Sequence, residues 1–167
     1  MKRVISLAIL AALTVIALAS CGLAPPLPSI KNGEFNFTVT YELNGEIQTV
    51  SGVYACEYSG IDFALEGENH REWCGYIKDG NVEEIITLAT AEDGGIVELN
   101  LHFEPGHLMG DPYYEGEEPF EPRLTVRLFD GGLYFENDPD LIAEVYGARI
   151  KSYECDAPVK NSFGLFN

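Results

Sequence analysis

The chain has few basic residues. Of its 167 residues only 10 are Lys or Arg, against 27 Asp or Glu, and the formal net charge is −17. Lys2 and Arg3 belong to the N-terminal segment discussed below, so residues 21–167 carry eight basic residues and a formal charge of −19. Such a surface repels phosphate backbones, which argues against a nucleic-acid partner. It also repels anionic lipid, so charge alone cannot hold the protein at a membrane.

Several common site motifs are missing. The three histidines, His70, His102 and His107, form no metal signature, because neither H-E-x-x-H nor a paired-cysteine spacing occurs. EF-hand spacing is absent as well, and no internal repeat is visible. Disorder is nevertheless not expected, because nine Phe, nine Tyr and one Trp add to the aliphatic residues that can form a core.

Only one long hydrophobic run is present, and it lies at the N-terminus. Val4–Leu18 is almost entirely apolar and follows Lys2 and Arg3. Its length is that of the apolar region of a signal peptide, and it is short for a membrane-spanning helix. The first twenty residues are therefore predicted to be an export signal.

The signal ends in Leu18-Ala19-Ser20-Cys21, which resembles the lipobox of bacterial lipoproteins. The resemblance implies cleavage before Cys21, a lipid on its thiol, and a location on the extracytoplasmic side of the cell membrane. Ala17-Leu18-Ala19 also fits an ordinary cleavage site, which would release a soluble secreted protein. A retained helix is a further alternative.

The chain is predicted to divide into three parts. Residues 1–20 are the signal peptide, and residues 21–33 are the lipidated cysteine and a proline-rich tether. The run Gly22–Pro28 is too rich in proline for a helix or a central strand and predicts an extended tether of about 3 Å per residue. Residues 34–167 are expected to form a single β-domain, which we expect to be a monomer.

Alternation of apolar and polar residues predicts β-strands. Residues 35–43 alternate strictly, and Asn44-Gly45 then predicts a hairpin turn. Residues 47–58 would be the partner strand, in which Gly52 marks a bulge or a close approach. Further strands are predicted at 71–78, 82–89, 96–103, 123–129, 133–136 and 148–155. The pattern favours an antiparallel β-sandwich, or a partly open barrel, of about seven or eight strands.

One short helix is predicted near residues 139–146. Asp138 is a suitable N-cap, Pro139 suits the first helical position, and Gly147 suits the residue that ends the helix. A buried stripe of Leu141, Ile142 and Val145 is expected.

Three segments of this domain, the first hairpin, Tyr54–Tyr58 and Ile150–Glu154, are similar to a group of uncharacterised cell-surface lipoproteins of Gram-positive-type bacteria. The similarity implies a location and no activity.

Three cysteines remain after Cys21, namely Cys56, Cys74 and Cys155. An exported compartment permits disulfides, and Cys56 with Cys74 is the pair expected to bond. The alternative is three reduced cysteines that serve as small hydrophobic residues. A Cys-His nucleophile finds no support in the local sequence.

A polar patch is predicted if the strands at 96–103 and 123–129 pair, because their outward faces carry Glu98, His102, Arg123 and Arg127. Either a solvated sheet face with cross-strand ion pairs or a ligand site would fit.

The most distinctive segment is Glu104–Pro122, a long loop rich in carboxylates, aromatics and proline. Loops of this length in compact domains are usually functional or disordered. Carboxylates can hold Ca²⁺ or hydrolyse a glycoside, and aromatics can anchor a protein or a glycan. A solvated acidic loop is the alternative. The candidate binding residues are Asp111, Tyr113, Tyr114, Glu115, Glu117, Glu118 and Phe120.

The sequence thus predicts a membrane-anchored, extracytoplasmic lipoprotein whose domain is a non-catalytic binding or interaction module. A structural or assembly subunit of a surface complex is one alternative. A hydrolase with carboxylate or Cys/His chemistry is another.

Overall fold

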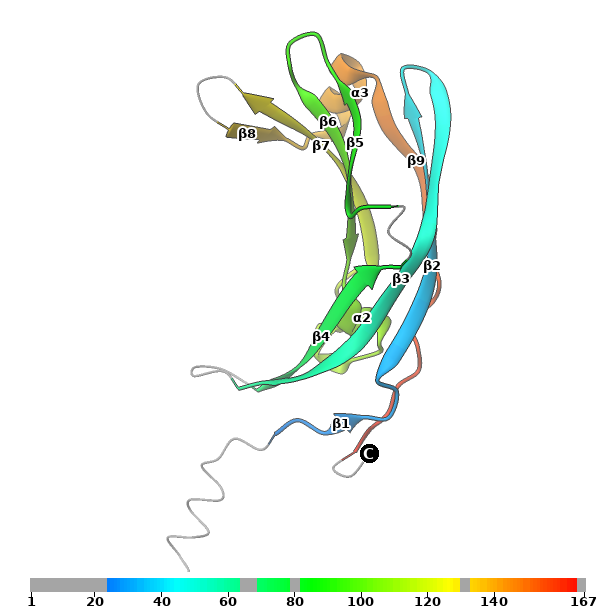
Figure 1. Cartoon of the computed structure of the whole chain (residues 1–167), viewed down its shortest axis with the longest axis vertical. Coiled ribbons are helices and arrows are strands. Elements are labelled where there is room, and N and C mark those ends of the chain that lie inside the picture. Colours follow the sequence, from blue (N-terminus) through cyan, green and yellow to red (C-terminus); the bar gives the residue numbers. More distant parts are fainter. Residues whose placement is uncertain (1–23, 64–68, 79–81, 130–132, 165–167) are drawn as a thin grey trace, which may run out of the picture.

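The protein is a sandwich of two antiparallel sheets, as the alternation predicts (Figure 1). The structure, a computed structural model, describes residues 24–63, 69–78, 82–129 and 133–164. One sheet has the order β4-β3-β2-β9, with bounds His70–Ile77, Glu46–Asp62, Asn32–Leu43 and Ala148–Cys155. The other has the order β5-β6-β7-β8, with bounds Ile85–Thr90, Ile96–Phe103, Phe120–Phe129 and Leu133–Glu136. The predicted mainly-β sandwich is confirmed.

The first hairpin, β2–β3, has the predicted turn. Asn44 and Gly45 have φ values of 52° and 85°, which only residues tolerant of the left-handed region adopt without strain. The turn sets the register from Leu43 opposite Glu46 onward. A Cβ on Gly52 would lie 2.9 Å from the ring of Phe37, so the predicted close approach at Gly52 is also confirmed.

The core lies between the two sheets and is dense in aromatic rings. Phe37 of β2 meets Phe103 of β6 edge to face at 5.1 Å between ring centroids. Tyr54 of β3 stacks on the same Phe103 ring at 3.9 Å, and Phe120 stacks on it at 4.4 Å. Cys56 of β3 is fully buried in this core. The aromatic cluster therefore joins the sheets near the start of β7.

Helix α3, Pro139–Tyr146, caps one end of the sandwich and has the predicted bounds. Asp138 accepts a hydrogen bond from the amide of Asp140 at 2.9 Å, and Gly147 ends the helix with φ 63°. The predicted buried stripe is wrong, however. Ile142 is fully buried, whereas Leu141 and Val145 are 41% and 57% exposed. A two-turn helix that rests on the end of the sandwich presents one narrow face to the core, and Ile142 lies on it together with the partly buried Tyr146.

The two ends of the described chain meet at the opposite end of the sandwich (Figure 1). Leu27–Pro28, strand β1, pairs with Phe163–Gly164, strand β10, in a small separate sheet. Pro28 is fully buried, and β2 begins at Asn32. Residues 27–33 therefore belong to the domain, and the tether predicted over 21–33 ends before Leu27.

Candidate functional site

The predicted binding loop is mostly folded into the domain, where it closes the end of the sandwich near β1. Its first part forms helix α2, Pro105–Leu108, and its middle part forms the 3-10 helix η1, Pro112–Tyr114. Leu108 and Met109 are fully buried beneath the sheets. Proline at the start of both helices and a carboxylate cap before each explain why this sequence folds into short turns.

Asp111 is the centre of a buried hydrogen-bond network. Arg71 donates to it twice, from Nε at 2.6 Å and from Nη2 at 2.5 Å. Trp73 Nε1 donates at 2.9 Å, and the amide of Tyr113 donates at 3.0 Å. Burial alone would raise the pKa of Asp111, but these hydrogen bonds outweigh it and hold that pKa below its usual value. Both carboxylate oxygens are thus occupied, so Asp111 is a structural anchor and is not free to bind a ligand.

The other predicted loop residues differ in their surroundings. Phe120 lies in the aromatic core, so it cannot anchor a partner. Tyr114 is half-buried and donates its hydroxyl hydrogen to the carbonyl of Arg71 at 3.3 Å. Tyr113 is 53% exposed and stacks on His70 at 4.8 Å between centroids. The three remaining candidates, Glu115, Glu117 and Glu118, are exposed to solvent.

The structure offers no grouping of metal ligands in the residues that it describes. No three His, Cys, Asp or Glu side chains of the described chain are placed to hold an ion. The calcium hypothesis was built on the carboxylates of residues 111–118, and Asp111 no longer contributes to it.

The predicted disulfide between Cys56 and Cys74 is wrong. Cys56 lies opposite Gly75, and Cys74 lies opposite Glu57, so the two thiols are on opposite faces of their sheet. Cys56 faces the core and Cys74 faces solvent. Burial raises the pKa of Cys56 to about 12 and that of Cys155 to about 11. Both thiols are therefore protonated at neutral pH and are poor nucleophiles.

The predicted patch on the outward face of β6 and β7 consists of ion pairs. The two strands pair as expected, and Arg127 contacts Glu98 at 2.6 Å, with the Glu98 side chain nearly buried. Arg123 pairs with Glu121, which lies opposite His102. The ion-pair interpretation fits these contacts better than a ligand site, but the face is not solvated at Glu98, which is buried.

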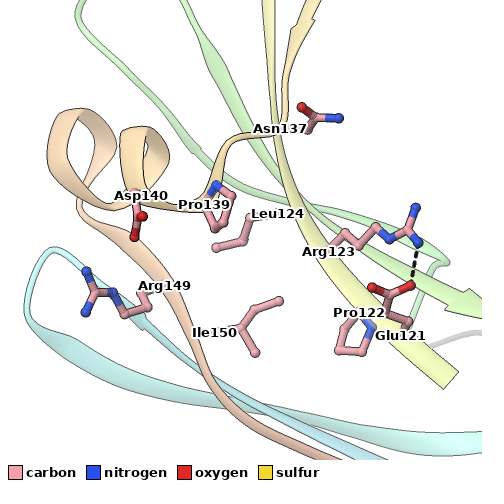
Figure 2. A pocket seen from close by; sticks show the side chains of 9 residues that line it. All are labelled: Glu121, Pro122, Arg123, Leu124, Asn137, Pro139, Asp140, Arg149 and Ile150. Carbon is pink, nitrogen blue, oxygen red and sulfur yellow. Dashed lines mark hydrogen bonds and ion pairs between the residues drawn. The ribbon is translucent and has the colours of Figure 1, made fainter. Parts of the chain in front are cut away.

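A groove of about 650 Å³ lies between β7, β9 and α3 (Figure 2). Figure 2 shows Leu124, Ile150 and Pro139 in its middle, with Arg149 on one side and Arg123 with Glu121 on the other. The lining is completed by Pro122, Asn137 and Asp140. Arg149 is exposed, and in the described part of the chain its guanidinium makes no side-chain hydrogen bond, although it attracts the carboxylate of Glu42, its neighbour across β2 and β9.

The groove lies where the sandwich is open on one side. Along residues 120–125 β7 has only β6 as a hydrogen-bonded neighbour, since β8 pairs from Val126 onward. β9 is an edge strand that pairs only with β2. Below the groove, Phe120 meets Tyr153 at 5.9 Å, and above it lies the start of α3. Sequence reasoning missed this groove, because its residues come from three separate segments that share no local pattern.

A smaller hollow of about 290 Å³ lies beside the closing loop. His107, Gly110 and Glu115 line it together with Asp111, whose carboxylate is engaged with Arg71. It therefore offers fewer free polar groups than the groove.

In the described residues, no helix is long and apolar enough to cross a membrane. Comparisons of the chain with protein-family models, with curated proteins and with solved structures find no match.

Proposed function

We propose that the protein is a lipid-anchored, extracytoplasmic binding module that holds a segment of a partner protein, in extended conformation, in the groove between β7, β9 and α3. The observation that carries the proposal is the groove itself. Its volume of about 650 Å³ lies within the range of small-ligand sites.

The lining of the groove favours a peptide over a sugar. Its middle is formed by Leu124, Ile150 and proline rings, which suit apolar side chains. Charged groups of both signs flank this apolar strip, and none of the nine lining residues is aromatic, whereas sugar sites commonly use aromatic stacking. The strand edges that border it can offer backbone N–H and C=O groups to an extended peptide.

The anchor is the second half of the proposal and is supported by the sequence alone. Basic residues, an apolar run and the lipobox ending at Cys21 occur in the order that bacterial lipoproteins use. A domain of charge −19 has no electrostatic affinity for anionic lipid, so a covalent lipid would be needed to hold it at a membrane.

Binding can be tested with a displayed library of random decapeptides and the soluble domain, starting at Ala24. Enriched peptides would be synthesised with a fluorophore, and their Kd values measured by anisotropy. Arg149→Ala should weaken binding about tenfold, the loss expected for one charge-assisted hydrogen bond. Lys151→Ala is the matched control, since Lys151 is an exposed cation of the same strand outside the groove. Failure to enrich any peptide, or equal binding by the Arg149→Ala variant and the wild type, would refute the groove as the site.

The anchor can be tested separately by mass spectrometry of the membrane fraction. The N-terminal peptide should begin at a lipid-modified Cys21, and Cys21→Ala should release the protein from the membrane. An unmodified N-terminus, with the protein free in the medium, would refute the anchor and leave the peptide groove untouched.

A further inference from the structure

The chain is fixed to the domain very soon after the expected lipidation site. Arg71 Nη1 donates a hydrogen bond to the carbonyl of Pro26 at 3.1 Å. Two residues later Pro28 is fully buried, in the strand that pairs with β10. Asn161 then holds both the amide and the carbonyl of Ile30, at 2.9 and 2.8 Å. From Pro26 onward the backbone therefore moves with the domain.

This attachment limits the distance between the domain and an anchored Cys21. Pro26 is five residues beyond Cys21, and five residues span at most about 18 Å even when fully extended. The inference rests on the proposed lipid anchor. With that anchor in place, the end of the sandwich that carries β1 must lie within about 18 Å of the bilayer surface.

The same end of the molecule carries exposed aromatic side chains. Tyr113 stacks on His70, which is next to Arg71 in β4. Phe63 follows Asp62, whose carboxylate lies 3.8 Å from His70. Phe63 is 64% exposed and Tyr113 is 53% exposed.

We propose that this end of the sandwich, with Phe63 and Tyr113 as its apolar contacts, rests on the lipid bilayer to which Cys21 anchors the chain. Aromatic side chains are favoured at the level of lipid headgroups, where an apolar ring and a polar neighbour are both accommodated. The lipid surface is the one partner that the short attachment keeps within reach at all times. Helix α3 lies at the far end of the sandwich (Figure 1), so the part of the groove that α3 lines lies away from the membrane.

The charge of the domain determines which lipids allow this contact. Glu115, Glu117 and Glu118 are exposed in the same closing segment and repel anionic headgroups. The repulsion decays over a Debye length of about 8 Å at physiological ionic strength, which is shorter than the attachment. The contact should therefore form on zwitterionic phosphatidylcholine and weaken on phosphatidylglycerol at low salt.

The test is hydroxyl-radical footprinting of the full lipidated chain in phosphatidylcholine vesicles, read by mass spectrometry. Relative to Cys21→Ser with the same vesicles present, oxidation of Phe63 and Tyr113 should fall severalfold. Phe135 and Tyr153 are matched internal controls, since they are 61% and 49% exposed. Their oxidation should not change. Equal oxidation of Phe63 and Tyr113 in both proteins would overturn the proposal.

Three further samples identify the cause of any protection. A flexible Gly/Ser insertion between Gly22 and Leu23 lengthens the attachment and should restore oxidation of Phe63 and Tyr113, whereas unchanged protection would overturn the argument from reach. Protection that is stronger on phosphatidylglycerol than on phosphatidylcholine would overturn the apolar contact. If Phe63 and Tyr113 are protected in Cys21→Ser at high concentration without vesicles, the surface binds a second copy of the chain. That result would also overturn the proposal.

The intact mass of the chain recovered from the vesicles separates this proposal from the anchor. A chain that carries no lipid and does not sediment with the vesicles refutes the anchor. A lipidated chain that sediments and shows no protection refutes only the orientation.

Discussion

The buried pair of Arg71 and Asp111 allows a quantitative test of the fold. The carboxylate of Asp111 has no solvent exposure, and the Arg71 side chain is 7% exposed. Asp111→Ala removes the acceptor of four hydrogen bonds. The guanidinium of Arg71 then keeps its contacts with the carbonyl of Pro26 and with the ring of Phe163, 4.3 Å away. Removing one partner of a buried ion pair costs about 3–5 kcal/mol, because the other charge stays buried without compensation.

Urea unfolding followed by the emission of Trp73, the one tryptophan of the chain, measures this loss directly. With an m-value of about 1–3 kcal/mol per M, the midpoint should fall by about 1–5 M. Glu42→Ala is the matched control, since Glu42 pairs with Lys151 on the surface of the same sheet and its loss should change the midpoint little. Adding Arg71→Met to Asp111→Ala should restore part of the loss, because it removes the orphaned charge. A loss below about 1 kcal/mol for Asp111→Ala would mean that the pair is solvated and does not hold this end together.

The same pair predicts how stability depends on pH. The folded-state pKa of Asp111 lies below its unfolded value of about 3.9, so its contribution to stability is fully present above about pH 4. It is lost as the pH falls through the folded-state pKa, when the carboxylate is protonated. Unfolding free energies of the wild type and of Asp111→Asn should therefore converge below about pH 4. A constant difference from pH 7 down to pH 2 would contradict this assignment.

Three further outcomes are expected. With the soluble domain at pH 8, a thiol reagent should modify Cys74 rapidly and Cys56 only after unfolding, and slow reaction of Cys74 would contradict its exposure. Leu101→Ala should lower the unfolding free energy by about 2–5 kcal/mol in urea titrations, since Leu101 is 3% exposed, and a value near zero would mean that the faces of β6 are inverted. Asp138→Ala should cost about 1 kcal/mol through the lost cap of α3, and Asp138→Asn, which keeps an acceptor, should cost less in the same assay.

The sequence predicted those parts of the fold that depend on local pattern. The apolar pattern of 96–103 predicted β6 with the observed bounds, the segment after the helix was predicted as a strand with the bounds of β9, and Asn44-Gly45 predicted the first turn. The segment around Asp111 was predicted to be an open loop because proline and glycine obscure its two short helices. This segment is held in place by Arg71, which is 40 residues from Asp111 in the sequence. A local pattern cannot show a contact between residues so far apart in the chain.

A hint of this network was nevertheless present in the sequence. Arg71 and Trp73 are two residues apart on a strand, so they share one face, and Trp73 indicates that this face is buried. A buried arginine requires a carboxylate, which would have pointed to an acidic residue elsewhere in the chain. The error over Cys56 and Cys74 has a similar origin, because nearness of two strands in sequence says nothing about their register, and a shift of one residue moves a side chain to the other face.

If the proposed lipid anchor is in place, the network around Arg71 would also link the stability of the domain to its distance from the membrane. One guanidinium holds the closing loop through Asp111, the chain end leading to Cys21 through Pro26, and the C-terminal segment through Phe163. Without Asp111, we expect the guanidinium of Arg71 to turn toward solvent and its hydrogen bond to the carbonyl of Pro26 to weaken. The attachment would lengthen by the residues thus released, at up to about 3.6 Å each. Under the proposed anchor, Arg71, which closes this end of the sandwich, would therefore also set how far the groove stands from the bilayer.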